Sequence, residues 1–600
     1  MRRRLTRRAV PAALVLLLAA TGTAVAAGAS STVDRTIADR DGDNRLEPAP
    51  GDAYLRRSEL GTRIAEGGFP LLTFGQLTDF QLVDEESPAR VEFLDKVGPP
   101  FTAAYRPQEG TSPQVVDAMV SEMANAVSPV THRRIDAAMT TGDNTDNTQC
   151  NEARWMIDIL DGAANADPRS CLAEGLRPER RRIDPDSGVE GTCGTVPDRS
   201  RYDGVRGDRE YYEPDASDGR DGPGYSPRQA QNEAEVQRSN AVRDFPGLFE
   251  RMNEPFEATG FKDVPWYGIF GNHDGLVQGN QNRDAALDAI ATDCLKVTDL
   301  PAGADPAGAP GALLEAGIAA GLTRTVPQDP RRHLLFKREY IAQHFVSSGT
   351  PAGHGFTQEN LASGEGYYGF SPRPGLRFLV LDTVSDAGGD GGNVDDEQFR
   401  WLDAQLAAAD AARELTLVIA HHTLETMNQV LSPFPPGDNP PVPAAPVHVG
   451  ETSRTSSCPD APGPGETVKC LFLRHPTVIG FLTGHEHNNR VRAVPRGAGP
   501  ADGGFWQVTT AAHIDWPQQS RLLDVVGNRD GSVSLWSTIL DHDAPAEPGS
   551  AVGSSKTQLA SISRELAFND PDAENGEDGR GDARGGEGDR NVELVVRDPR

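Results

Sequence analysis

The chain has 600 residues, with 88 acidic side chains against 58 basic ones, and its formal net charge is -30. This acidity argues against a nucleic-acid-binding surface, which needs a basic patch, but it leaves open a phosphate pocket because bound cations can invert the local field. The length allows one large domain with insertions or several smaller domains, and the 63 glycines and 46 prolines indicate many loops.

Residues 1–30 have the pattern of an export signal peptide. A basic start precedes the apolar run at 12–20, and residues 24–26 have the Ala-x-Ala form of a cleavage site. Residues 6–10 resemble a twin-arginine signal, with the Sec route as the alternative. Since no other apolar run is long enough to span a bilayer, we expect a secreted or cell-surface protein without a transmembrane segment after cleavage.

Composition divides the rest of the chain. Residues 31–70 are polar and irregular, whereas residues 71–545 alternate strand-like and helix-like patterns. Within them, about 148–245 is rich in Arg, Asp, Gly and Pro, which we interpret as a loop-rich insertion and a surface lid. Residues 546–600 are acidic and glycine-rich, which predicts a largely disordered tail with one short helix at 561–568.

Each predicted strand in the first half of the chain ends at a polar cluster. A helix beginning at Ser112, with a capping residue and a first-turn proline, lies between the first two strands. The strands are residues 71–77, before Asp79 and Gln81; residues 135–140, before Asp143 and Asp146; and residues 264–270, before Asn272, His273 and Asp274.

The second half repeats this pattern. Asp395 is expected to cap a helix, and His513, just past a strand, is a further candidate to line a pocket. The predicted strands are 367–370 and 376–381, which pair; 415–420, before His421 and His422; 478–482, before His485 and His487; and the closing antiparallel strands 506–511 and 522–536.

Strands that alternate with helices indicate an α/β fold. Polar clusters follow five of the strands, and open α/β sheets bind their ligands at the carboxyl ends of strands. His485 and His487 can reach one point because Gly484 permits a tight turn, and imidazole is the commonest transition-metal side-chain ligand. The sequence therefore predicts a metal site at this edge.

In their order along the chain the clusters read D-x-Q, G-D-x-x-D-N, G-N-H-D, H-H and G-H-x-H. They resemble the motifs of the calcineurin-like metallophosphoesterase superfamily, closest to a secreted actinobacterial-type branch, over roughly residues 70–545. The resemblance implies a four-layer α/β/β/α sandwich. It also implies a secreted hydrolase of phosphate mono- or diesters, with a small phosphate-ester substrate and two divalent metal ions such as Mn, Fe or Zn.

The resemblance also assigns roles to the residues. A hydroxide bridging the two metals would attack phosphorus, while His273 would contact the phosphate or protonate the leaving oxygen, and Asp274 would orient His273. The metal ligands would be Asp79, Gln81 and His487 for one ion, Asn272, His421 and His485 for the other, and Asp143 between both.

Three positions depart from the family pattern or leave a choice. Gln81 replaces the usual histidine, and because an amide oxygen binds zinc-like metals less well than imidazole, it binds directly, binds through water, or leaves the first site half-built. His421 is favoured over the neighbouring His422 as the ligand. Asp146 occupies the position of the iron-ligating tyrosine of purple acid phosphatases, so we expect no obligate ferric ion and place Asp146 behind the ligands, with direct metal binding as the alternative.

A second class of function stays open. An exported, non-catalytic binding protein of the same fold could use its metal to hold a phosphorylated ligand. Gln81 favours this alternative, whereas His273 and the bridging Asp143 favour the enzyme. A purely structural protein would not need five ligand clusters.

The six cysteines of an exported chain favour disulfides. We expect Cys171–Cys193 and Cys458–Cys470, each closing a local Gly/Pro-rich loop, which leaves Cys150–Cys294 by elimination. No Cys-x-x-Cys motif occurs in the sequence, so a structural zinc ribbon is not expected.

Overall fold

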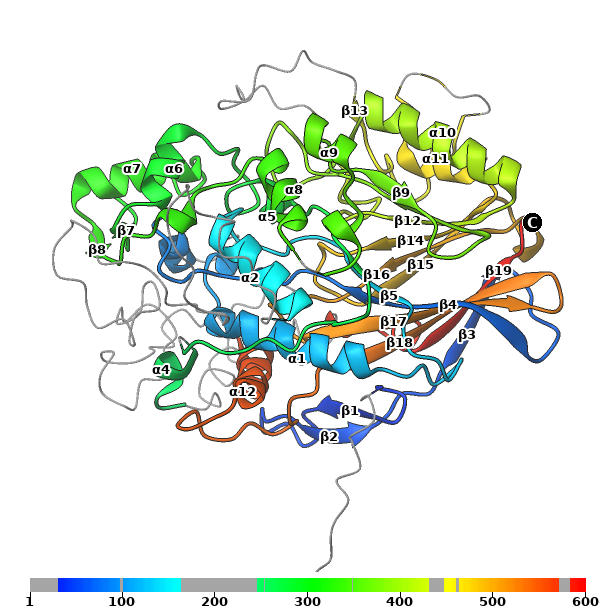
Figure 1. Ribbon diagram of the computed structural model, residues 1–600, viewed down its shortest axis with the longest axis horizontal. Helices are drawn as coiled ribbons and strands as arrows, with labels where there is room; N and C mark the ends of the chain where they lie inside the picture. The colour runs from blue at the N-terminus through cyan, green and yellow to red at the C-terminus, as the bar shows by residue number, and fades with distance from the viewer. Residues whose placement is uncertain are drawn as a thin grey trace, which may run out of the picture.

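The computed structural model describes residues 31–97, 101–162, 245–252, 254–347, 349–430, 447–459, 463, 465–570 and 583–600. The expected export signal and most of the expected insertion, residues 163–244, lie outside the described residues. Two large β-sheets with helices packed on them form a mixed α/β fold (Figure 1). The predicted α/β class is therefore confirmed.

The first sheet has seven strands in the order β3-β19-β18-β17-β4-β5-β6. β4, β5 and β6 are parallel, so their carboxyl ends lie at one edge, and β17 and β18 form a hairpin antiparallel to β4. The strands are β3 (Leu55–Leu60), β4 (Gly68–Leu77), β5 (Ala137–Thr140), β6 (Trp266–Tyr267), β17 (Gln519–Asn528), β18 (Ser532–Asp541) and β19 (Val592–Arg597).

The second sheet has six strands in the order β15-β16-β14-β12-β10-β9. Its four central strands are parallel, and β9 and β15 flank them in antiparallel directions. Parallel strands covered on both faces are expected to be mostly apolar, and β12 and β14 are buried along their whole length. The strands are β9 (Tyr368–Phe370), β10 (Leu376–Val380), β12 (Leu415–Ile419), β14 (Val478–Thr483), β15 (Arg490–Pro495) and β16 (Gly504–Thr509).

Helices α10 (Asp396–Ala412) and α11 (Val468–Arg474) cover one face of the six-stranded sheet (Figure 1). Leu402 of α10 and Phe472 of α11 pack in one buried cluster with Phe481 of β14. The predicted cap is confirmed, because the carboxylate of Asp395 accepts hydrogen bonds from two first-turn amides of α10.

A larger cluster joins the two sheets. Phe74 of β4 and Phe378 of β10 meet edge to face, with ring centroids 5.2 Å apart. Helix α1 (Ser112–Asn125), which begins at the predicted residue with a proline in its first turn, adds Met119 and Met123 to the same core. Since fully burying one such side chain contributes about 1.5–3 kcal/mol, this packing fixes how the strand ends of the two sheets face each other.

Shorter elements complete the fold. The remaining helices are α2 (Cys150–Asp161), α4 (Leu248–Met252), α5 (Asn272–Gly275), α6 (Ala285–Ala291), α7 (Pro310–Ala320), α8 (Lys337–Phe345), α9 (Gln358–Ser363) and α12 (Lys556–Asn569). Three small sheets pair β1 (Arg35–Ala38) with β2 (Glu47–Pro50), β7 (Leu295–Val297) with β8 (Thr323–Thr325), and β11 (Val394–Asp395) with β13 (Val447–His448). Across the described ranges, no helix combines the length and apolar character needed to span a bilayer.

The C-terminal region differs from its prediction. The predicted helix at 561–568 is confirmed within α12. Instead of a largely disordered tail, the region also contains the strand β19, which lies between β18 and β3 in the seven-stranded sheet. Figure 1 shows the red β19 beside the blue β3. Composition missed this strand because its buried residues Val592, Leu594 and Val596 follow a long acidic, glycine-rich stretch that dominates the average.

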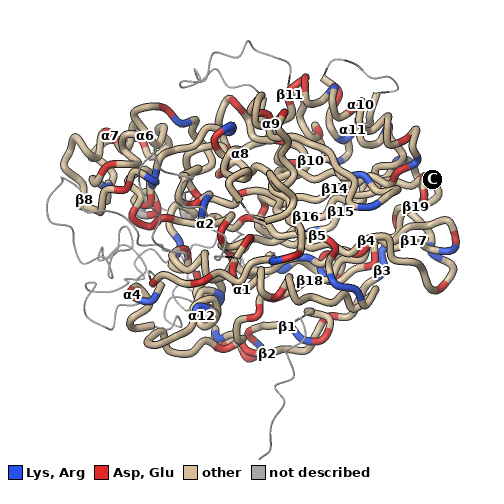
Figure 2. The backbone as a smooth tube through the Cα atoms, in the orientation of Figure 1, with Lys and Arg blue, Asp and Glu red and all other residues tan. Residues whose placement is uncertain are grey.

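Two other predicted boundaries also change. Residues 31–70 are not irregular throughout, because they contain β1, β2, β3 and the start of β4. The predicted insertion does not begin at residue 148, because Met156 and Ile159 of α2 lie in the main core. Acidic and basic residues are interspersed over the described elements (Figure 2).

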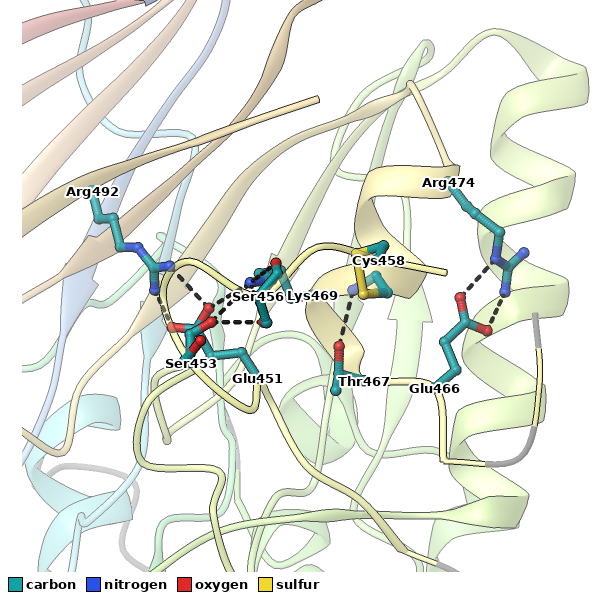
Figure 3. Close-up of a disulfide and its surroundings, with 10 residues drawn as sticks. Glu451, Ser453, Ser456, Cys458, Glu466, Thr467, Lys469, Arg474 and Arg492 are labelled. Atoms are coloured by element: carbon teal, nitrogen blue, oxygen red, sulfur yellow. Dashed lines mark hydrogen bonds and ion pairs between the residues drawn. A yellow bond between two sulfur atoms is a disulfide. The ribbon is translucent and has the colours of Figure 1, made fainter. Parts of the chain in front are cut away.

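The predicted disulfide Cys458–Cys470 is confirmed, with an S–S distance of 2.07 Å (Figure 3). It attaches residues 447–459 to α11, whose first turn is capped by Thr467, since the Thr467 hydroxyl accepts from the amide of Cys470 at 3.3 Å. Cys150 and Cys294 are also disulfide-bonded. The expected Cys171–Cys193 pair lies outside the described residues, so the pairing of these four cysteines stays a prediction.

Ion pairs hold the same region (Figure 3). The carboxylate of Glu451 lies 3.0 Å from Lys469 Nζ and 2.6 Å from Arg492 Nη1. The Lys469 ammonium also donates to the carbonyl oxygens of Ser453 and Ser456, each at 3.0 Å. The disulfide loop is thereby tied both to α11 and to β15.

Candidate metal centre

The polar clusters that follow β4, β5, β6, β12 and β14 meet at one place. The amide of Asp79 donates to the carbonyl of Gly142 at 2.9 Å, and the amide of Gly484 donates to the carbonyl of His421 at 3.0 Å. The amide of His485 joins the two sheets, because it lies 3.2 and 3.1 Å from the two carboxylate oxygens of Asp79. Residues about 400 positions apart in sequence therefore share one site.

Three side-chain atoms at this site form a tight triangle. His421 Nε2 lies 3.0 Å from Asn272 Oδ1 and 3.2 Å from His485 Nδ1, and the last two atoms are 3.2 Å apart. Asp143 Oδ2 lies 3.1 Å from His421 Nε2. Adjacent ligands of a cation with bonds of about 2.0–2.1 Å lie roughly 2.9–3.4 Å apart, so these spacings fit one ion.

Neighbouring contacts leave two of these atoms as acceptors when the side chains are neutral. His421 Nδ1 lies 2.8 Å from the carbonyl of Thr141, and because a carbonyl only accepts, Nδ1 carries the hydrogen and Nε2 keeps a lone pair in the neutral ring. The amide nitrogen of Asn272 donates to the carbonyl of Gly279 at 3.1 Å, which turns Oδ1 toward the histidines. Lone pairs at such distances repel unless a proton or a cation lies between them.

The pKa values of Asp143, His421 and His485 reflect their burial and how close these groups lie to one another. Burial alone would raise the pKa of Asp143, but His421 and His273 hold it well below its ordinary value. Burial lowers the pKa of His421, but the charge and hydrogen bond of Asp143 outweigh burial and raise that pKa to about 9. Burial, followed by the charge of His421, lowers the pKa of His485 to about 3. One proton on His421 can therefore relieve the repulsion, and a cation that binds must displace it.

A second group of predicted ligands lies beside the first. His487 Nε2 is 3.3 Å from Asp79 Oδ1, and its Nδ1 is 2.7 Å from the carboxylate of Asp515. A metal-binding histidine commonly uses its second nitrogen in this way. Gln81 is 2% exposed, its backbone N–H donates to the carbonyl of Asp143 at 2.9 Å, and its Oε1 has no hydrogen-bond partner in the described part of the chain. A buried acceptor oxygen without a donor suits a cation.

Backbone strain marks the same residues. Among the described residues, 13 other than glycine have a positive φ, and five of them are predicted ligands. Such a conformation costs of order 1–3 kcal/mol for a residue with a side chain, and outliers of this kind cluster at functional sites. The five are Asp79 (φ 49°), Gln81 (φ 38°), Asp143 (φ 51°), His485 (φ 71°) and His487 (φ 49°).

His273 lies at the edge of the metal site. Its amide donates to Asp143 Oδ1 at 2.8 Å, and its Nδ1 lies 2.7 Å from the backbone carbonyl of Asp146. Because that carbonyl only accepts, Nδ1 carries a hydrogen. The side chain is 18% exposed, so the ring combines a fixed Nδ1 with partial access to solvent.

The expected role of Asp274 is corrected by its contacts. Its carboxylate accepts from the amides of Asn144 and Thr145, at 3.0 and 2.9 Å, and from the Tyr340 hydroxyl at 3.1 Å. Burial, followed by the nearby charge of Asp143, raises the pKa of Asp274 to about 6. Asp274 therefore holds the loop that carries Asp143, and the orienting partner of the His273 ring is the Asp146 segment.

The two adjacent histidines after β12 point differently. His422 Nδ1 lies 2.8 Å from the Thr383 hydroxyl, and its Nε2 lies 3.0 Å from the carbonyl of Asp390. A ring nitrogen of His422 is within 4.8 Å of ring nitrogens of His421 and His485, but both of its nitrogens already have protein partners. The geometry therefore favours His421 as the ligand and places His422 beside it.

Asp515 is a site residue that the sequence reading missed. Its carboxylate contacts His487 and also lies 2.8 Å from Arg106 Nε. His513, the residue noted in that stretch, is instead buried, with Nδ1 2.7 Å from the Thr78 carbonyl and Nε2 3.0 Å from the Ser520 hydroxyl. A carboxylate just past a strand of the same edge was the signal that could have found Asp515.

No family model and no curated protein matches the chain. One solved structure similar to this chain is the crystal structure of a dimetal phosphatase from Danio rerio, with 12% identity and a TM-score of 0.31 over 79% of this chain and 100% of that chain. A likeness at this level supports no argument about activity, so the geometry of the site carries the proposal.

Proposed function

We propose that the protein is an exported, metal-dependent phosphoesterase that hydrolyses phosphate mono- or diesters on a four-layer α/β/β/α sandwich. The observation that supports this most is the triangle of acceptor atoms on Asn272, His421 and His485, beside the carboxylate of Asp143. Acceptors held at 3.0–3.2 Å by the surrounding hydrogen bonds favour a bound cation.

The donor set fits two divalent ions. Asn272, His421 and His485 would hold one ion, and Asp79, Gln81 and His487 would hold the other. Asp143 would serve both, since a carboxylate offsets the repulsion between close cations. When bound, such ions stabilise negative charge on phosphoryl oxygens and lower the pKa of water to about 7.

His273 would supply the proton for the leaving oxygen. Its Nδ1 is held by the Asp146 carbonyl at 2.7 Å, so Nε2 is the nitrogen that can exchange a proton with substrate. Its amide contact with Asp143, at 2.8 Å, keeps the ring next to the metal ligands. Positioned proton transfer of this kind contributes typically 10²–10⁴-fold to a rate.

The runner-up is a non-catalytic exported protein that binds a phosphorylated ligand through its metal. The amide side chain of Gln81, a weaker ligand than imidazole, favours this reading. The held ring of His273 favours hydrolysis, because binding alone does not need a proton donor fixed at one nitrogen.

The test is a substrate panel with the mature protein and added Mn²⁺. A nucleotide monoester, a cyclic nucleotide and a glycerophosphodiester are compared by the rate of phosphate or alcohol release. Asp143→Asn and His273→Ala should lower turnover at least about 100-fold, whereas His132→Ala, at an exposed position, should not. Wild-type turnover no higher than that of Asp143→Asn would leave the binding protein as the function.

A further inference from the structure

The His273 ring depends on a segment that needs support of its own. The carbonyl of Asp146 holds Nδ1 at 2.7 Å, while the carboxylate oxygen Oδ1 of the same residue lies only 3.8 Å from that nitrogen. Two acceptors of Asp146 therefore compete for the ring. The groups that hold the Asp146 carboxylate therefore determine whether the carbonyl or the carboxylate accepts the hydrogen bond from His273 Nδ1.

Gln278 holds that carboxylate from one side. Its Nε2 donates to Asp146 Oδ2 at 2.9 Å, and its Oε1 accepts from the amide of Val91 at 3.1 Å. Its own amide donates to the Asn147 side chain at 3.0 Å. A φ of 50° puts Gln278 in the left-handed region, which is unfavourable for a residue with a side chain. This conformation directs both the amide and the side chain toward residues 146 and 147.

Arg90 is a charged partner of the same carboxylate oxygen. Its Nε lies 3.1 Å from Asp146 Oδ2, an ion pair without hydrogen-bond geometry. The guanidinium is fixed in turn, because Nη1 donates to Glu92 at 2.6 Å and both terminal nitrogens donate to Glu109, at 2.7 and 2.9 Å. The Arg90 side chain is 1% exposed. A buried arginine held by two carboxylates is a rigid support.

The loop of Gln278 also contacts the site directly. Gly279, at φ 64°, leaves room for the His273 ring, since a Cβ there would lie 2.5 Å from His273 Nε2. The carbonyl of Gly279 accepts from the side-chain Nδ2 of Asn272. The residue that restrains Asp146 thus adjoins both the proton donor and a metal ligand.

We propose that Gln278 and Arg90 are positioning residues that clamp the Asp146 carboxylate, so that the Asp146 carbonyl keeps His273 turned with Nε2 toward the leaving oxygen. This inference rests on the proposed hydrolytic function and deepens it. Among the described residues, the side chains of Gln278 and Arg90 bond to groups other than the predicted metal ligands, so the clamp acts on proton delivery and leaves metal binding intact.

The first test uses Gln278→Ala, which is the milder change because Gln278 is only partly buried. With aryl phosphate esters, kcat should fall about tenfold for phenyl esters, whose leaving oxygen needs the proton, and less than about twofold for nitrophenyl esters. KM and metal content should stay at wild-type values. Glu315→Ala, an exposed change on helix α7, is the control and should leave both esters unaffected.

A double-variant cycle examines whether Arg90 acts on the same group. Arg90→Lys keeps the charge but loses the fork of donors, and it should show the same selective loss with phenyl esters. If both residues act through Asp146, the losses of Gln278→Ala and Arg90→Lys are not additive in the double variant. Additive losses, or equal losses on both esters together with reduced metal content, overturn the proposal.

A second readout does not depend on turnover. In the zinc-loaded full-length protein, ¹⁵N NMR of the His273 ring should show hydrogen on Nδ1, and Gln278→Ala should change that signal while Glu315→Ala does not. A ring signal unchanged in Gln278→Ala refutes the clamp. If the ring responds as expected but the wild type hydrolyses no ester, the clamp stands and the proposed hydrolytic function fails.

Discussion

Gly271→Ala is a direct way to test the assignment of Asp143. A Cβ at Gly271 would lie 2.1 Å from Asp143 Oδ1 and 2.2 Å from Asp143 N, whereas ordinary contact begins near 3.4 Å. The φ of Gly271 is -106°, which any residue can adopt. The effect of the substitution therefore comes from the steric contact with Asp143 and not from backbone strain. Asp143 must move by more than about 1 Å, and a displacement of that size can cost about 100-fold in rate.

The expected result is a fall of about 100-fold in kcat/KM, which is about 2.7 kcal/mol of transition-state stabilisation, with fewer than two metal ions per chain. The matched control is Gly499→Ala, where a Cβ meets nothing within 4 Å and φ is -140°. Thermal melting of the metal-free proteins separates local displacement from unfolding. A Gly271→Ala protein that keeps wild-type turnover and metal content would refute the placement of Asp143 at the centre of the site.

Three further predictions concern stability. Burial is the main reason that the pKa of His344 and of His354 is lowered to about 3. In the unfolded chain an imidazole binds its proton near pH 6.5. The free energy of unfolding should therefore fall by a few kcal/mol as the pH drops from about 6.5 toward 3. Denaturant unfolding should show a shallower fall for His344→Phe, and equal slopes would contradict this account. Replacing both Cys458 and Cys470 by serine opens a loop with a sequence separation of 12, so stability should drop by about 3 kcal/mol; an unchanged denaturation midpoint would argue against it. Deleting residues 583–600 removes β19 from between β18 and β3 and should abolish soluble folded protein, an expectation that a truncated chain with the wild-type melting temperature would rule out.

The fold elements that the sequence predicted are those governed by local rules. Asp395 caps α10 as expected, because capping chemistry lies within one helical turn. Helix α1 begins at Ser112 as expected, but the predicted cap is wrong, since no described side chain caps its first turn. The apolar runs before Asp79, His421 and His485 are strands, because a buried parallel strand is apolar along its whole length. Local pattern thus located most of the strand ends that carry the candidate site.

What the sequence could not supply depends on long-range contacts. β19 pairs with β3, more than 500 residues earlier, and no local pattern announces such a partner. The left-handed backbone at Asp79 and His487 is imposed by surrounding structure, since neither residue type requires it. The sequence predicted that Asp274 orients the His273 ring, whereas in the structure the carbonyl of Asp146 does so. Only the folded chain shows which of the two residues faces the ring.

Hydrolysis and simple ligand binding can be distinguished by side chains that a binding protein would not require. Acceptors on Asn272, His421 and His485 would suit a cation in either protein, so they do not discriminate. His273 does, because its Nδ1 is fixed by a carbonyl, and that carbonyl belongs to a residue whose carboxylate is held apart by Gln278 and Arg90. A site that only held a phosphate would gain nothing from defining which ring nitrogen faces the ligand, whereas proton transfer to a leaving oxygen requires that definition.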